Sequence, residues 1–168
     1  MSSILPRERR RLTTNIKDSL RELTNQVSLL NHKVGTKIEL RDVDLDCLDL
    51  ISREGPMSPS ALARRTGLHP ATMTGILDRL QRAGWITRER DPDAADRRAV
   101  TVRALRDRGG EIFHLYAGMN SAMDKICGGY TDEQLAVLAD FLRRATDAGR
   151  AATDALASDE PTAALASE

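Results

Sequence analysis

Two short helical segments joined by a tight turn constrain the fold of this chain more than any other feature of the sequence. Ser58 is a favourable N-cap, Pro59 a favourable first helical residue, and Gly67 can adopt the left-handed conformation that ends a helix. A second helix is predicted over residues 71–83. Its apolar face is formed by Met73, Ile76, Leu77 and Leu80. Two helices separated by so short a turn predict a helix-turn-helix.

A β-hairpin is predicted directly after this motif. Residues 85–90 (WITRER) and 99–105 (AVTVRAL) alternate between apolar and polar side chains, as paired strands do. The segment between them, DPDAADRR, is polar, contains proline, and ends in the neighbouring arginines Arg97 and Arg98. The pattern predicts a two-stranded wing with basic side chains at its tip.

Long helices are predicted on both sides of this region. The first covers residues 7–33 and carries one apolar stripe with spacings of three and four residues. The stripe is formed by Leu12, Ile16, Leu20, Leu23, Val27, Leu30 and Val34. It suits packing against a helix of a second chain or within the core of one chain. Further helices are predicted over residues 112–126 and from Thr131, which forms a capping motif with Gln134.

Length and composition limit the class of protein. A chain of 168 residues suits a single domain, and it contains neither an apolar run long enough for a membrane span nor a secretory signal. Cys47 and Cys127 lack the spacing of metal ligands, so we expect reduced thiols, no metal and no cofactor, in a cytoplasmic protein without a membrane partner.

Charge is unevenly distributed although the net charge is zero. Residues 52–108 carry a net charge of +5, whereas residues 109–168 carry −6. A basic middle segment indicates a surface for a polyanion. Arginine supplies 21 of the 25 basic residues, which favours bidentate and groove contacts, although a bias in genome composition has the same effect.

A helix-turn-helix followed by an arginine-tipped hairpin suits double-stranded DNA, because a helix fits the major groove and a thin basic ribbon the minor groove. Thr72 and Thr74 can contact bases, and Arg79 and Arg82 can reach phosphates; the alternative is that each threonine is an ordinary solvated residue. The predicted DNA contacts are Ser58, Ser60, His69, Ala71, Thr72, Thr74, Gly75, Arg79, Arg82, Asp96, Arg97 and Arg98.

The same residues resemble a known family. The stretches SPSALARRTGL (58–68), TMT (72–74), LDRL (77–80), AGWI (83–86) and the wing from RDP (90–92) to DRRAVTV (96–102) are similar to the MarR family of bacterial winged-helix transcriptional regulators. The resemblance implies that Arg98 enters the minor groove, that Asp96 orients it, and that Arg97 is a second basic contact. It also implies a homodimer on a pseudo-palindromic operator, acting as a repressor that a small-molecule effector or cysteine oxidation releases.

The expected fold class is mainly α, a winged helix-turn-helix with N- and C-terminal dimerisation helices. We expect one domain over residues 1–155, with dimerisation helices in 7–40 and 107–155, a winged lobe in 43–105, and a flexible acidic, alanine-rich tail in 156–168. An effector pocket between helices and lobe is implied by the resemblance. The candidates for its lining are His32, Trp85, Tyr116 and Met119.

Two positions depart from the family pattern. Gly75 stands where many relatives carry a long polar side chain, and His69 stands where serine or threonine often caps the second helix; we interpret it as a partly exposed structural histidine. Peroxide sensors of the family carry a cysteine near the start of the first helix, but this chain has none before Cys47. We therefore interpret Cys47 and Cys127 as small buried apolar residues.

Two other classes of function have to be compared with DNA binding. An enzyme would need a nucleophile with a base, a metal cluster or a phosphate loop, and the scattered histidines 32, 69 and 114 supply none of these. We expect no enzymatic activity. A winged-helix module for protein contacts or nonspecific DNA architecture remains an alternative. The paired arginines of the wing argue against protein contacts.

Overall fold

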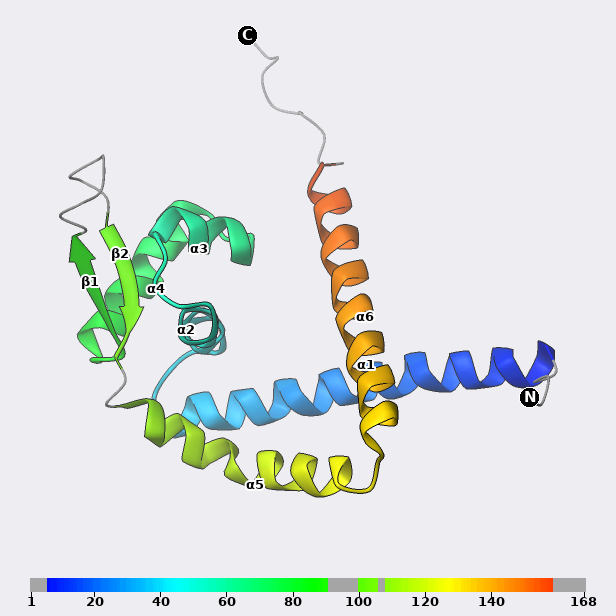
Figure 1. Ribbon diagram of the computed structural model, residues 1–168. Helices are drawn as coiled ribbons and strands as arrows, with labels where there is room; N and C mark the ends of the chain where they lie inside the picture. Colours follow the sequence, from blue (N-terminus) through cyan, green and yellow to red (C-terminus); the bar gives the residue numbers. More distant parts are fainter. Residues whose placement is uncertain (1–5, 91–99, 106–107, 159–168) are drawn as a thin grey trace, which may run out of the picture. The chain divides into compact units, whose positions relative to one another are not determined.

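The computed structural model describes residues 6–90, 100–105 and 108–158 (Figure 1). The elements in chain order are α1 (Pro6–Lys37), α2 (Asp42–Glu54), α3 (Pro59–Thr66), α4 (Pro70–Arg82), β1 (Ile86–Arg90), β2 (Val100–Ala104), α5 (Gly109–Cys127) and α6 (Asp132–Ser158). The chain divides into two compact units, Met1–Tyr116 and Ala117–Glu168. The mainly helical fold with one small antiparallel sheet confirms the predicted fold class.

The helix-turn-helix is formed by α3 and α4, and the residues predicted to cap these helices do so. Ser58 Oγ accepts a hydrogen bond from the backbone N–H of Ala61 at 3.2 Å, and Gly67 ends α3 with a φ of 67°. His69 caps α4, because its Nδ1 accepts from the backbone N–H of Ala71 at 3.2 Å. These local bonds explain why the turn begins and ends where the sequence predicts.

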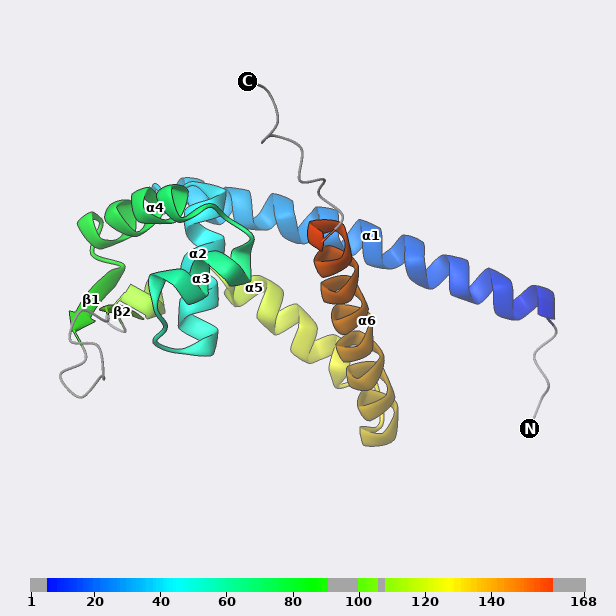
Figure 2. The same ribbon diagram turned by 90° about the horizontal axis from the view of Figure 1, so that it is seen from above.

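The wing strands β1 and β2 are antiparallel, with Arg88 opposite Val102, and lie beside α4 (Figures 1 and 2). A third strand position was not predicted. Met57 exchanges both backbone hydrogen bonds with Val102, at 3.1 and 2.8 Å. Because Met57 directly precedes the N-cap of α3, the base of the wing is fixed to the helix-turn-helix. The predicted tip, with Asp96, Arg97 and Arg98, lies outside the described residues.

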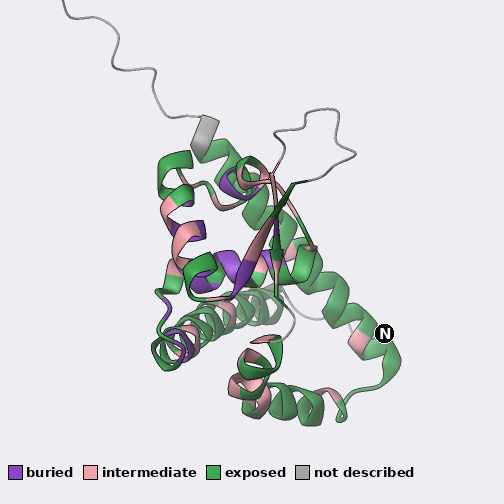
Figure 3. Ribbon diagram, turned by 90° about the vertical axis from the view of Figure 1, so that its left-hand side faces the viewer, coloured by how far each residue is buried: buried purple, intermediate pink, exposed green. Residues whose placement is uncertain are grey.

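The core of the first unit lies where α2, α3, α4 and the sheet meet, as the buried segments in Figure 3 show. The residues that are 2% exposed or less include Leu48, Ile51, Leu62, Met73, Ile76, Leu77, Leu80, Trp85, Ile86 and Val102. They include the whole apolar face predicted for the second helix. The guanidinium of Arg108 stacks 3.7 Å over the Trp85 ring, which closes the core on that side.

The long helices carry exposed apolar residues in the single chain. On α1 the side chains of Leu12, Ile16, Leu23 and Val27 are exposed, and only the stripe's C-terminal end, at Val34, is buried. The second unit likewise exposes Met123, Ile126, Val137, Leu138, Phe141 and Leu142. Among the described residues, no helix combines the length and the apolar composition that crossing a membrane requires.

In the second unit, α6 begins with the predicted capping motif. Thr131 N–H donates to Gln134 Oε1 at 2.9 Å, and Gln134 N–H donates to Thr131 Oγ1 at 3.3 Å. The helix extends to Ser158, into the segment expected to be a tail, and residues 159–168 lie outside the described part.

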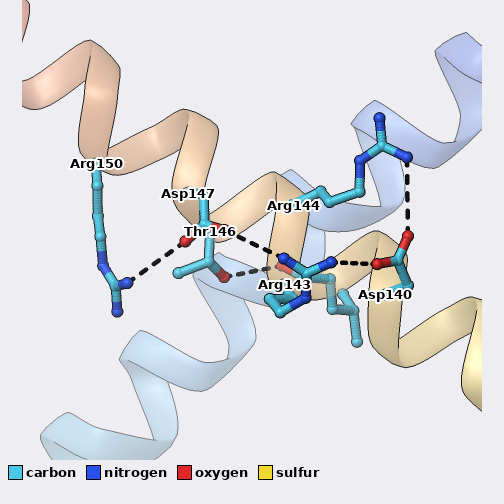
Figure 4. Close-up of polar contacts among 7 residues, drawn as sticks. Asp140, Arg143, Arg144, Thr146, Asp147 and Arg150 are labelled. Atoms are coloured by element: carbon cyan, nitrogen blue, oxygen red, sulfur yellow. Dashed lines mark hydrogen bonds and ion pairs between the residues drawn. The ribbon is translucent and has the colours of Figure 1, made fainter.

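One face of α6 carries alternating charges (Figure 4). Arg143 pairs with Asp140 and lies 3.7 Å from Asp147, and Arg150 lies 3.5 Å from Asp147. Opposite charges three and four residues apart stabilise an exposed helix by about 0.2–0.5 kcal/mol per pair.

Candidate nucleic-acid interface

The N-terminal half of α4 presents an exposed surface of small side chains. Ala71, Thr72 and Thr74 are exposed, and Gly75 is half-buried. Thr74 Oγ1 donates to the carbonyl oxygen of Pro70 at 3.1 Å, so its methyl group and oxygen lone pairs, rather than its hydroxyl proton, are available to a ligand. Arg82, in the last turn, is exposed and has no polar partner among the described residues.

The predicted residues of α3 lie next to this surface. An open groove of about 560 Å³ runs between α3 and α4, and both Ser60 and Thr74 line it. Ser60 Oγ lies 3.1 Å from Ser58 Oγ, and His69 is exposed at the start of α4. Ser58, Ser60, His69 and Ala71 lie at helix starts, where backbone N–H groups attract phosphate.

Arg79 has a role that the sequence did not indicate. Its Nε and Nη2 donate to the two carboxylate oxygens of Asp44 at 2.9 and 2.6 Å, and the Asp44 side chain is only 2% exposed. This hydrogen bonding raises the pKa of the Arg79 guanidinium above its ordinary value. Nη1 is the nitrogen left without a bond to Asp44, and a Cβ at Gly75 would lie 3.5 Å from it.

The neighbouring residue binds the wing. Arg88 Nη2 on β1 donates to Asp78 Oδ1 at 2.7 Å, with both side chains partly exposed. Within the wing, Arg103 Nε donates to Glu89 Oε2 at 3.2 Å. α4 is thus held to the sheet on one side and to α2 on the other.

Known proteins share this helix-turn-helix with its attached wing. The sequence profile of the MarR family matches residues 40–100. The uncharacterized HTH-type transcriptional regulator YcgE of Bacillus subtilis is 31% identical over 127 residues, which cover 76% of this chain and 81% of the relative. The chain belongs to the MarR family. It is therefore a DNA-binding transcriptional regulator and not an enzyme, as the sequence predicted.

Solved structures share the MarR fold. A MarR family protein from Bacillus stearothermophilus is 19% identical with a TM-score of 0.64, over 84% of this chain and 97% of that one. FabT of Streptococcus pneumoniae, solved in complex with DNA, is 24% identical with a TM-score of 0.58, over 80% of this chain and 95% of that one. At these identities the likeness establishes the fold alone.

The residues suggested for an effector in this MarR-family chain have different surroundings. His32 Nδ1 lies 3.1 Å from both carboxylate oxygens of Asp42, Tyr116 donates to Asn31 at 2.7 Å, and Trp85 is buried in the core. Burial, followed by the charges of Asp49 and Asp46, raises the pKa of Tyr116. Met119 is half-buried in the second unit. A cavity of about 270 Å³ lies elsewhere, lined by residues such as Ile51, Pro56 and Leu105.

The two cysteines of this MarR-family chain differ. Cys47 is fully buried, as predicted, and burial together with the charges of Asp44 and Asp46 raises the pKa of its thiol to about 11. Cys127 is half-buried rather than buried, because it ends α5 where the chain turns toward α6. In the described part of the chain, no three His, Cys, Asp or Glu side chains gather as a metal site.

Proposed function

We propose that this MarR-family regulator is a sequence-specific homodimeric repressor that acts in the cytoplasm and is released from a pseudo-palindromic operator by a small-molecule effector. The surface of α4 is the observation that best supports a DNA interface. Its N-terminal half is exposed and lined by small side chains, and Arg82, which has no polar partner among the described residues, follows at its C-terminal end. Small residues let a helix approach base edges closely, and arginine binds phosphate.

The wing supplies the second contact in this proposal. Residues 91–99 connect β1 to β2 and include Asp96, Arg97 and Arg98. An arginine at the tip of a narrow ribbon suits the negative potential of a narrow minor groove. The fold itself is compatible with a duplex, since FabT has been solved in complex with DNA.

Exposed apolar surface supports the dimer. Four residues of the α1 stripe are exposed, namely Leu12, Ile16, Leu23 and Val27, and Phe141 and Leu142 on α6 are exposed as well. Apolar stripes of this length rarely stay in contact with water in a stable protein. A second copy of the chain that covers them with the same surfaces forms a closed, two-fold assembly, which matches a two-fold operator.

Separating base contacts from phosphate contacts tests the proposal. The operator is first obtained by selecting duplexes from a random library with the purified native protein. Thr72→Ala with Thr74→Ala should change the preferred bases and leave the salt dependence unaltered, because no charge is removed. Arg82→Ala should weaken all duplexes alike and reduce the slope of log K against log salt by about one.

Arg150→Ala is the matched control, since it removes the same charge from α6 outside the winged lobe. This variant should keep the native base preference and the native slope of log K against log salt. Recovery of no common motif by the native protein would reject sequence-specific binding and leave a nonspecific role. A threonine pair that changes the salt slope while Arg82 changes base preference would place α4 in the groove by a different end.

A further inference from the structure

Asp78 and Arg79 are consecutive residues of α4 that bind in two different directions. Arg79 binds Asp44 of α2 through two hydrogen bonds, and Asp78 binds Arg88 of β1 at 2.7 Å. Adjacent residues of a helix are separated by about 100° around its axis, so neighbouring side chains can reach different elements. Helix α4 is therefore held between α2 and the wing by one pair on each side.

The charge of Asp78 is unfavourable for a surface that meets DNA. Asp78 follows Ala71 and Gly75 along the exposed side of α4, and its side chain is 45% exposed. A carboxylate facing a polyanion reduces affinity by repulsion unless it has another role. Its bond to Arg88 neutralises it, and the same bond occupies an arginine that is only 29% exposed. The two charged side chains of this pair therefore hold the wing, and Arg88 binds Asp78 rather than phosphate.

Arg88 lies where its bond to Asp78 can attach the base of the wing to α4. Arg88 lies opposite Val102 in the sheet, and Val102 is bound in turn to Met57, directly before α3. The base of the wing is thus attached to the start of α3 by backbone bonds and to α4 by the ion pair. Strand β1 leads from Arg88 into the segment that carries Arg97 and Arg98. The angle between helix and wing depends on both attachments.

We propose that Asp78 and Arg79 are positioning residues for DNA binding: they fix α4 relative to α2 and to the wing, so that helix and wing meet the two grooves together. The proposal rests on the proposed DNA-binding function, and it assigns to Asp78 and Arg88 a joint role rather than two separate contacts. A wing that is already held at a fixed angle loses less conformational entropy on binding than a loosely held wing does. Asp78 thereby increases the affinity for DNA, although its negative charge repels the DNA phosphates.

A substitution that removes the charge of Asp78 tests this proposal, because repulsion and positioning predict opposite changes in the affinity for DNA. Repulsion alone predicts that Asp78→Asn binds the selected operator more tightly than the native protein. Positioning predicts weaker binding, by about tenfold for a coupling of ordinary size, with unchanged or slightly stronger binding to a scrambled duplex. Fluorescence anisotropy with both duplexes at matched salt measures the two affinities. Glu89→Gln is the matched control, because it also removes one negative charge from an arginine pair, but that pair lies within the wing.

A double-mutant cycle separates joint from independent roles. Asp78→Asn, Arg88→Gln and the double variant should lose operator affinity to a similar extent, because each removes the same ion pair. Additive effects, or an Asp78→Asn variant that binds the operator as tightly as the native protein, would overturn the proposal. Partly exposed ion pairs contribute little to folding, so thermal unfolding should change only slightly. Asp78→Glu, which keeps the carboxylate, should retain most of the affinity and replaces Asp78→Asn as the probe if the latter does not fold.

Failure of the underlying function has a different signature. If the native protein itself prefers no selected duplex over the scrambled one, sequence-specific binding is rejected whatever the variants do. If the native protein shows that preference and the Glu89→Gln control behaves like Asp78→Asn, general electrostatics explains the change and the positioning role is wrong.

Discussion

At the scale of the residue, the buried carboxylate of Asp44 is the most demanding group in the winged lobe. Removing a carboxylate from water costs several kcal/mol unless a partner compensates for it, and Arg79 does so with two bonds in good geometry. Asp44 lies in the first turn of α2, where a carboxylate interacts favourably with the helix dipole. Nothing local to residue 44 indicated a partner on α4, because the ion pair depends on how two helices pack.

Loss of Arg79 should therefore destabilise the protein far more than loss of Arg82. Arg79→Ala leaves the Asp44 carboxylate buried and unpaired, and should lower the free energy of unfolding by about 3–5 kcal/mol. Arg82→Ala, which removes an exposed arginine of the same helix without a partner in the described part of the chain, should change it by no more than about 0.5 kcal/mol. Urea unfolding of both variants at one protein concentration measures the difference. Equal losses would show that the Asp44 pair does not carry this stability.

Cys47 should be unreactive in the folded protein. Its thiol is fully buried and has a pKa of about 11, so at pH 8 only about one thiol in a thousand is ionised. A thiol reagent should label Cys127 alone at pH 8 and both cysteines in denaturant. The Cys47→Ser variant should react like the native protein, and Cys127→Ser should react hardly at all. Rapid labelling of Cys47 in the Cys127→Ser variant would restore it as a candidate redox sensor.

At the scale of the element, local signals located the helices and strands well. Ser58, Gly67 and the Thr131–Gln134 motif act where they stand in the sequence, so reading them needed no tertiary information. Contacts between distant residues were missed. The bridge from Met57 to Val102 and the pair from Asp78 to Arg88 depend on the sheet's position, which hydrophobic periodicity does not encode. The predicted DNA contacts on α3 and α4 lie on neighbouring helices, but their function stays a prediction.

The acidic face of α2 limits the stability of that helix. Burial raises the pKa of Asp46, and the charges of Asp42 and Asp49 add to this effect. The folded protein therefore binds a proton at Asp46 more tightly than the unfolded chain does. As pH rises through the ordinary range for aspartate and above it, the folded state loses stability relative to the unfolded state.

Asp46→Asn should accordingly stabilise the protein at pH 7. It removes like-charge contacts with Asp42, four residues before it, and Asp49, three residues after it, for a gain of about 0.5 kcal/mol. The gain should shrink as the pH is lowered and the native Asp46 carboxylate takes up a proton, because the raised pKa makes it do so before an ordinary aspartate would. Thermal unfolding between pH 4 and 7 measures it. Asp124→Asn, on α5, is the control for loss of one negative charge; an equal gain there would remove the local explanation.

At the scale of the whole molecule, the distribution of apolar residues is uneven. The core of the winged lobe buries its aliphatic side chains almost completely, whereas α1, except toward its C-terminal end, and the second unit leave most of theirs in contact with solvent in the single chain. Both outcomes had been open for the α1 stripe on sequence grounds, since a heptad-like spacing serves a core or a partner equally well. The exposure of Leu12, Ile16 and Leu23 favours a partner. In the proposed dimer, a second copy would cover the apolar surface that these helices expose.

The dimer makes the strongest whole-molecule prediction, and α1 supplies a matched pair of leucines to test it. Leu23 belongs to the apolar stripe and is 46% exposed, while Leu29 lies off the stripe and is 58% exposed. Leu23→Asp places a charge in the proposed interface twice per dimer. At about 1.5 kcal/mol or more for each lost leucine contact, the dissociation constant should rise at least about 100-fold. Leu29→Asp introduces the same charge and should leave the dimer intact.

Multi-angle light scattering over a dilution series, combined with operator binding, measures the outcome. Only Leu23→Asp should lose both the dimer mass and the binding to the operator. A native chain with monomer mass at micromolar concentration would reject the dimer outright.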